Sequence, residues 1–167
     1  AIKPDLAEAH HNLGVVFNEL GNHDEAISSY RTALDLNSEY VGSHNNLGMI
    51  LQTQGKLDEA LSCFRKALTI DADSVETQKN LGDVFLELGR HEESLDHFVK
   101  AIELDPDTPT NLINLLKGGS GLNPGKVIEQ VRALAPESVR PDMLAYALSC
   151  NKPDENAERL YKEASKR

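Results

Sequence analysis

The sequence predicts an all-α fold, a right-handed α-solenoid of stacked helical hairpins. The triplet Asn-Leu-Gly begins at Asn12, Asn46 and Asn80, so each copy follows the last after 34 residues. Apolar residues within each copy recur at intervals of three and four, which is the spacing of one helix face. A second glycine then follows each triplet at a constant distance, at Gly21, Gly55 and Gly89. Each copy therefore reads as two amphipathic helices joined by a turn.

The first repeat, residues 7–40, contains two apolar stripes. Gly21 stands between them, where glycine readily adopts the left-handed conformation that ends a helix. One hairpin cannot bury both of its faces, so neighbouring hairpins are expected to stack. The first stripe consists of Leu13, Val16, Phe17 and Leu20, and the second consists of Ala26, Ile27, Tyr30, Ala33 and Leu34.

The second and third repeats, residues 41–74 and 75–108, keep the same signature. We use two names below. The ring position holds Tyr30, Phe64 and Phe98, and the first glycine position holds Gly14, Gly48 and Gly82. Small residues permit close approach of helices while a ring fills the remaining space. Two further small positions hold Ala26, Ala60 and Ser94, and Ala33, Ala67 and Ala101.

The ends of the chain carry weaker repeats. Residues 1–6 match the end of a repeat, like "ELDPD" at 103–107, so we expect them to be the tail of a truncated preceding copy. Residues 109–137 form a degenerate, shortened repeat. Residues 138–167 regain the pattern and end in a charged helix that is typical of a cap. The chain is therefore expected to be a segment of a longer protein.

These residues resemble the tetratricopeptide repeat, with its 34-residue unit, Leu-Gly, second Gly, Ala, aromatic and Ala. The resemblance covers residues 7–108 and departs where the family often has Trp, because this chain has His10, His44 and Gln78. The resemblance implies a non-catalytic protein-interaction scaffold with a concave groove lined by the first helix of each hairpin.

The composition excludes several classes of function. Lys and Arg total 17 against 27 Asp and Glu, a formal charge of -10, which argues against nucleic-acid binding. No apolar run reaches the roughly 18 to 20 residues that span a bilayer. There is no signal-peptide pattern, and a cytoplasmic location is favoured although the compartment is not determined.

The sequence contains no recognisable catalytic, metal-binding or cofactor-binding motif. In "KGGSGLNPGKV", residues 117–127, a phosphate-binding loop fails at Ser120 and Val127, so we interpret the stretch as a linker. Cys63 and Cys150 form no CxxC pair. The histidines, including the pair His23 and His91 at one repeat position, lack metal-binding spacing and are interpreted as structural.

The predicted groove wall carries asparagine at one position in four successive repeats, namely Asn12, Asn46, Asn80 and Asn114. Asparagine is not favoured inside a helix, and its amide can both donate to and accept from a peptide backbone. The row resembles the asparagine ladder of O-GlcNAc transferase repeats, although hydrogen bonds to neighbouring helices would explain it equally. The remaining candidate peptide-binding residues are His11, Asn45, Met49, Lys79 and Asp83.

The sequence thus predicts a scaffold that binds an extended, neutral or basic peptide segment, with no cofactor. The Lys, Asn and basic side chains by which some relatives clamp acidic tails are not supplied, because their places hold His11, Val15, Glu76 and Asn80. Two alternatives remain open. The chain could be the substrate-recruiting arm of a larger enzyme such as a glycosyltransferase, or a module that self-associates through its N-terminal end into a homo-oligomer.

Overall fold

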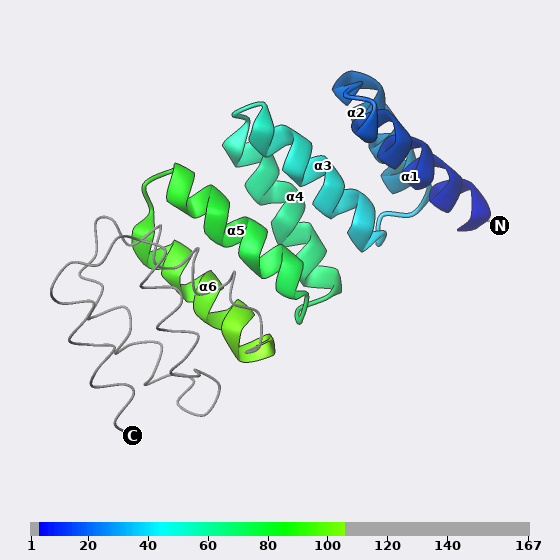
Figure 1. Cartoon of the computed structure of the whole chain (residues 1–167). Coiled ribbons are helices and arrows are strands. Elements are labelled where there is room, and N and C mark those ends of the chain that lie inside the picture. The colour runs from blue at the N-terminus through cyan, green and yellow to red at the C-terminus, as the bar shows by residue number, and fades with distance from the viewer. Residues whose placement is uncertain (1–3, 106–167) are drawn as a thin grey trace, which may run out of the picture. The chain divides into compact units, whose positions relative to one another are not determined.

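The computed structural model describes residues 4–105, which form six α-helices and no strand within that range (Figure 1). The predicted all-α fold of helical hairpins is confirmed. The chain divides into two compact units, Ala1–Asn80 and Leu81–Arg167, with the division inside α5. The helices are α1 (Pro4–Glu19), α2 (His23–Leu36), α3 (Val41–Thr53), α4 (Leu57–Ile70), α5 (Val75–Glu87) and α6 (His91–Leu104).

The second glycines end the first helix of each hairpin as predicted. Gly21, Gly55 and Gly89 have φ of 77°, 73° and 71°, which is the left-handed region. A Cβ at any of the three would meet nothing within 4 Å. Backbone conformation rather than lack of space therefore explains glycine at these turns.

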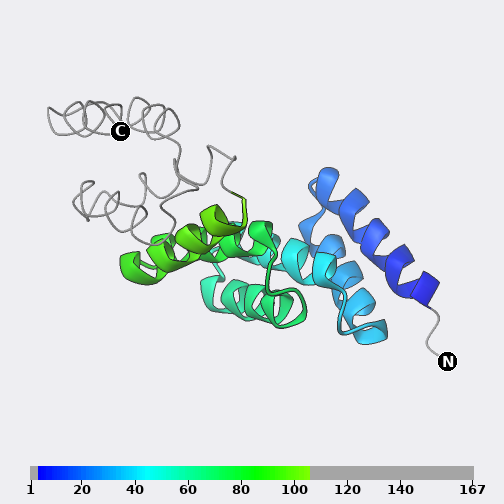
Figure 2. The ribbon, with the colours of Figure 1, turned by 90° about the horizontal axis from the view of Figure 1, so that it is seen from below.

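In the first unit, α1 packs against α2 and α3 packs against α4, and α2 also contacts α3 (Figure 2). Burying apolar surface of this kind is the main force that holds the hairpins together. The buried core draws on every one of these helices. It includes Ala7, Ala26, Tyr30 and Ala33 from the first hairpin, and Leu47, Ile50, Leu51, Ala60, Leu61, Phe64 and Ala67 from the second.

Each ring lies directly over the first glycine of its own hairpin. A Cβ built on Gly14 would stand 2.6 Å from Cε1 of Tyr30, and one on Gly48 would stand 2.7 Å from Cε1 of Phe64. Both rings are completely buried, so a shift of either ring would disturb the packing around it. The helices approach closely only because these glycines lack a side chain, which confirms the packing role predicted for them.

Two of the residues that stand where the tetratricopeptide repeat often has Trp, His44 and Gln78, form hydrogen bonds to the preceding repeat. Nε2 of His44 donates to the carbonyl oxygen of Ser38 at 2.9 Å, and Nε2 of Gln78 donates to that of Ala72 at 3.5 Å. His44 is only 6% exposed, so its structural role is confirmed. His23 differs, because it is exposed and lies 3.2 Å from Oδ1 of Asn18.

The described part of the second unit, residues 81–105, repeats this packing. Oγ of Ser94 donates to the carbonyl of Gly82 at 2.8 Å, and a Cβ on Gly82 would stand 2.7 Å from Cε1 of Phe98. The Arg90 guanidinium lies 4.7 Å from the centre of the Phe85 ring. Small residues and a ring therefore join the end of α5 to α6.

The two ends of the described range border the segments predicted to be atypical repeats. Helix α1 begins at Pro4, so residues 4–6, expected to be the tail of a preceding repeat, form its first turn. Proline suits that place because the first helical N–H has no partner in the helix. The predicted segments 109–137 and 138–167, with Asn114, Ser120 and Cys150, lie outside the described residues. Cys63 is a free, partly buried thiol on α4.

Candidate functional site

Three asparagines of the first unit lie on successive first helices, and we call their shared surface the asparagine face. Asn12 on α1 is exposed, while Asn46 on α3 and Asn80 on α5 are half-buried. Helix α1 lies beside α3, and side-chain hydrogen bonds link α1 to α3 and α3 to α5. The three asparagines that the structure describes therefore lie on neighbouring helices.

The three asparagines have different surroundings. Nδ2 of Asn46 donates to the hydroxyl of Tyr30, on α2, at 3.2 Å. Nδ2 of Asn80 is buried and has no hydrogen-bond partner among the described residues. The ring preceding Asn80 by the same 16 residues is Phe64, which has no hydroxyl. The alternative role for asparagine, bonding to a neighbouring helix, thus applies at Asn46.

Tyr30 presents a neutral hydroxyl to this face. Burial raises the pKa of Tyr30 above its ordinary value, and the hydrogen bond from Asn46 opposes that shift only in part. Glu19 adds to the increase. Because it stays protonated at neutral pH, Tyr30 accepts from Asn46 and retains a proton of its own to donate.

His11 lies between the rings of two tyrosines. Its ring centre is 4.8 Å from that of Tyr40 and 5.6 Å from that of Tyr30, and its Nδ1 lies 3.0 Å from Oγ of Ser43. A Cβ on Gly42 would stand 3.1 Å from Cε1 of His11, so Gly42 leaves space for the imidazole. Burial lowers the pKa of His11 more than Glu8 raises it, so the ring is neutral at neutral pH.

Asn45 is placed differently from the other candidate residues. Its side chain is 4% exposed, and its Oδ1 accepts from Oγ1 of Thr77 at 2.9 Å. This bond repeats the link from His11 to Ser43 one repeat later, since each spans 32 residues. Sequence reasoning missed Ser43 and Thr77. The available signal was a small hydroxyl residue at the same place in two successive repeats.

The other candidate residues are distributed over α3 and α5. Met49 is 43% exposed, which leaves its flexible thioether open to contact. Lys79 is half-buried on the first part of α5. Asp83 is also half-buried but belongs to the second unit, so its position relative to the asparagine face is not described.

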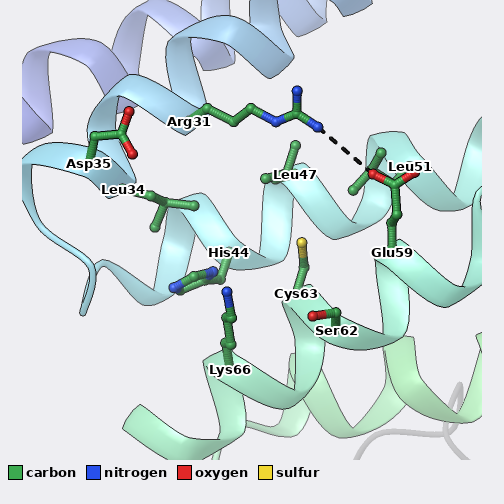
Figure 3. A pocket seen from close by; sticks show the side chains of 10 residues that line it. All are labelled: Arg31, Leu34, Asp35, His44, Leu47, Leu51, Glu59, Ser62, Cys63 and Lys66. Carbon is green, nitrogen blue, oxygen red and sulfur yellow. Dashed lines mark ion pairs between the residues drawn. The ribbon is translucent and has the colours of Figure 1, made fainter.

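A separate pocket of about 350 Å³ lies between α2, α3 and α4 (Figure 3). Its charges include Arg31 and Glu59, whose Nη2 and Oε2 are 3.8 Å apart at the solvent-exposed rim. Burial raises the pKa of the Cys63 thiol, so this thiol lacks the activation expected of a nucleophile. The pocket is lined by Arg31, Leu34, Asp35, His44, Leu47, Leu51, Glu59, Ser62, Cys63 and Lys66.

Among residues 4–105, no group of three or more His, Cys, Asp and Glu side chains is arranged to hold a metal ion. Within the same range, no helix combines the length and the apolar character needed to cross a membrane.

Solved structures share the fold of this chain at low sequence identity. The first tetratricopeptide domain of Spaghetti (RPAP3), bound to the HSP90 peptide SRMEEVD, is 20% identical with a TM-score of 0.69; the match covers 72% of this chain and 95% of that one. MamA is 18% identical with a TM-score of 0.70, covering 81% of this chain and 80% of that one. The second such domain of human RPAP3, in complex with the HSP70 peptide SGPTIEEVD, is 20% identical with a TM-score of 0.67, covering 71% and 99%.

Sequence comparison assigns the family. No curated protein matches the chain significantly. The family model described as the tetratricopeptide repeat matches residues 5–73 and again residues 39–107. Together these spans cover residues 5–107, more than half of the 167 residues. The chain therefore belongs to the tetratricopeptide repeat family.

Proposed function

We propose that this chain is a protein-interaction scaffold whose asparagine face binds an extended peptide segment mainly through its backbone. The observation that carries the proposal is the row of Asn12, Asn46 and Asn80 on successive helices, each exposed or half-buried. Structures of similar fold, described above, hold short peptides. These three asparagines differ from Asn45, the neighbour of Asn46. Asn45 is buried and forms a hydrogen bond with Thr77.

The amide of asparagine suits this role because a peptide backbone alternates N–H and C=O groups. One carboxamide can donate to the carbonyl and accept from the N–H. Packed helices lie roughly 8 to 10 Å apart, and an extended chain advances about 3.3 Å per residue. One asparagine would therefore engage about every third peptide residue, largely independently of the peptide sequence.

The charges near the asparagine face favour neutral or basic peptides. Exposed Glu8 and Glu76 lie on α1 and α5, and Lys79 is the basic residue among the candidate site residues. An acidic peptide such as SRMEEVD would meet like charge and would lack a basic clamp. This expectation separates the chain from the neighbour that holds that peptide.

A pair of peptides tests the proposal. SRMEEVD is compared with SRMQQVN bearing a C-terminal amide, in which every acidic group is neutralised at nearly constant shape. We expect the peptide without acidic groups, which keeps the positive charges of its Arg and its N-terminus, to shift the signals of Asn12, Asn46 and Asn80 in ¹⁵N-labelled chain at lower concentration than the acidic one. Tighter binding of SRMEEVD, or no shift from either peptide at millimolar concentration, would contradict a sequence-tolerant, backbone-reading surface.

A second candidate function, self-association, is favoured by exposed apolar residues of α1 together with Leu20, the residue that directly follows this helix. Leu6, Leu13, Val16 and Leu20 are 47%, 43%, 49% and 68% exposed. Their spacing of seven, three and four residues places them on one side of the helix. Contiguous apolar surface of this kind commonly mediates association. Sedimentation velocity over a hundredfold range of concentration tests it: dimers that Leu13→Glu abolishes support association, and a monomer throughout excludes it.

A further inference from the structure

The pocket between α2, α3 and α4 combines an apolar lining with charged groups of both signs. Its volume of about 350 Å³ falls within the roughly 300 to 1,000 Å³ that is typical of small-molecule sites. The apolar lining consists of Leu34 from α2 and of Leu47 and Leu51 from α3. Sites of this kind hold the apolar part of a ligand and use a few polar groups to fix its orientation.

The charges at the two ends of the pocket differ in their pairing. At one end, Nη2 of Arg31 lies 3.8 Å from Oε2 of Glu59, so these two charges partner each other (Figure 3). At the other end lie Asp35 of α2 and Lys66 of α4, and both are exposed (Figure 3). Neither the carboxylate of Asp35 nor the ammonium of Lys66 has a hydrogen-bond or ion-pair partner among residues 4–105. One negative and one positive group are therefore open to a ligand at this end.

His44 leaves a third polar group unsatisfied at the same end of the pocket. Its Nε2 donates to the carbonyl oxygen of Ser38, so Nδ1 of the neutral ring is an acceptor. Nδ1 is buried and has no hydrogen-bond partner in the described part of the chain. Folded proteins satisfy nearly all buried polar groups, so an unsatisfied one calls for an explanation. The side chain of Lys66 points toward this ring, and a polar ligand beside Lys66 would bring further donors to this end (Figure 3).

We propose that the pocket binds a small zwitterion with an apolar side chain, such as a free α-amino acid. Asp35 accepts from the ammonium group of the ligand, Lys66 donates to its carboxylate, and the leucines contact its side chain. A ligand with a single charge fits less well, because a carboxylate alone would be repelled by Asp35 and an ammonium alone would be repelled by Lys66.

This site is separate from the asparagine face. His44, Leu47 and Leu51 recur at intervals of three and four residues and so share one side of α3, whereas Asn46 falls outside that spacing. Binding in the pocket therefore needs no contact with the proposed peptide surface. Failure of either proposal leaves the other standing.

Four probes separate the two charges from the apolar contact. L-leucine carries all three features, isocaproate lacks the ammonium group, isoamylamine lacks the carboxylate, and glycine lacks the side chain. Each probe is titrated into the full chain labelled with ¹⁵N and with ¹³C in the leucine methyl groups. We expect L-leucine to give saturable shifts of the Leu47 methyl signals and the backbone amide signal of His44. Each of the other three probes should bind more weakly by roughly tenfold or more, because each loses one contact.

Two substitutions with matched controls assign the roles of the charges. Asp35→Asn should weaken binding of L-leucine by roughly tenfold and remove its advantage over isocaproate. Lys66→Gln should weaken binding similarly and remove the advantage of L-leucine over isoamylamine. The controls Asp58→Asn and Lys56→Gln change exposed residues that do not line the pocket, and both should bind L-leucine like the wild type.

The proposal fails if L-leucine gives no saturable shift at high-millimolar concentration, or if any of the other three probes binds as tightly. It also fails if Asp35→Asn and Lys66→Gln retain the discrimination of the wild type. Circular dichroism of both variants excludes loss of folding as the cause of weaker binding.

Discussion

The first two hairpins have the same repeat pattern but are covered to different extents. Leu13 on α1 is 43% exposed, whereas Leu47, its equivalent on α3, is 5% exposed. The contact inside each hairpin shows no such difference, because a Cβ on Gly14 or on Gly48 would meet its ring at 2.6 or 2.7 Å. Packing within a hairpin is thus set by its own 34 residues, while burial of the next apolar position depends on a neighbouring helix.

The largest expected effect comes from the equivalent leucines Leu13 and Leu47, which differ in burial between the two hairpins. Leu47→Ala should lower the free energy of unfolding by about 2 to 5 kcal/mol, because it leaves a cavity in packed surroundings. Leu13→Ala should change it by less than about 0.5 kcal/mol, as surface substitutions usually do. Urea denaturation of the two variants measures both values, and equal losses would refute the contrast in burial.

The glycines beneath the rings should behave alike in both hairpins. Gly14→Ala and Gly48→Ala each force a methyl group into a fully buried ring, which costs about 1 to 3 kcal/mol. Part of this loss is offset by the better helix propensity of alanine, worth roughly 1 kcal/mol. Thermal unfolding should show a loss of similar size in both variants. A stabilised Gly48→Ala would mean that the ring is free to shift.

The smallest expected effect concerns pH and the first hairpin alone. Burial holds the pKa of His11 below its ordinary value, so the unfolded chain binds this proton more tightly than the folded one. The resulting stability is fully present above about pH 6.5. It is lost as the pH falls through the folded pKa of His11.

Unfolding midpoints measured between pH 7.5 and 5 check this effect. His11→Gln should show a smaller decline toward acid than wild type, since it removes the titrating group. Its equivalent in the second hairpin is Asn45, which does not titrate in this range. Identical pH profiles for wild type and His11→Gln would contradict the assigned direction.

The periodicity of the sequence was sufficient to predict the hairpins, because the contacts within a hairpin are local. The 34-residue spacing predicts the turns at Gly21 and Gly55, and both are found. It also predicts close helix approach at the small residues, and the structure adds that Phe64 is the ring that lies against Gly48. Contacts between repeats were harder to predict. They depend on how far a helix is rotated about its axis, and periodicity fixes that rotation only approximately.

Asn45 and Asn46 show how the uncertain rotation of a helix affects prediction of the candidate site. Adjacent helical residues point about 100° apart, so a small rotation of α3 decides which of them reaches the surface. Asn45 is buried against Thr77, and Asn46 reaches the hydroxyl of Tyr30. Asn12, at the equivalent place on α1, is exposed. Hydrogen bonds between side chains 16 or 32 residues apart leave no periodic signal of their own.

The proposal that the asparagine face binds peptide backbone is tested most directly by calorimetry on the full chain. Amidated SRMQQVN is titrated into wild type, into the double variant Asn46→Ala/Asn80→Ala, and into the control Asn22→Ala, with folding checked by circular dichroism. Loss of two hydrogen bonds should weaken binding roughly tenfold or more in the double variant and leave the control unchanged. Equal affinity for all three proteins would contradict the proposal.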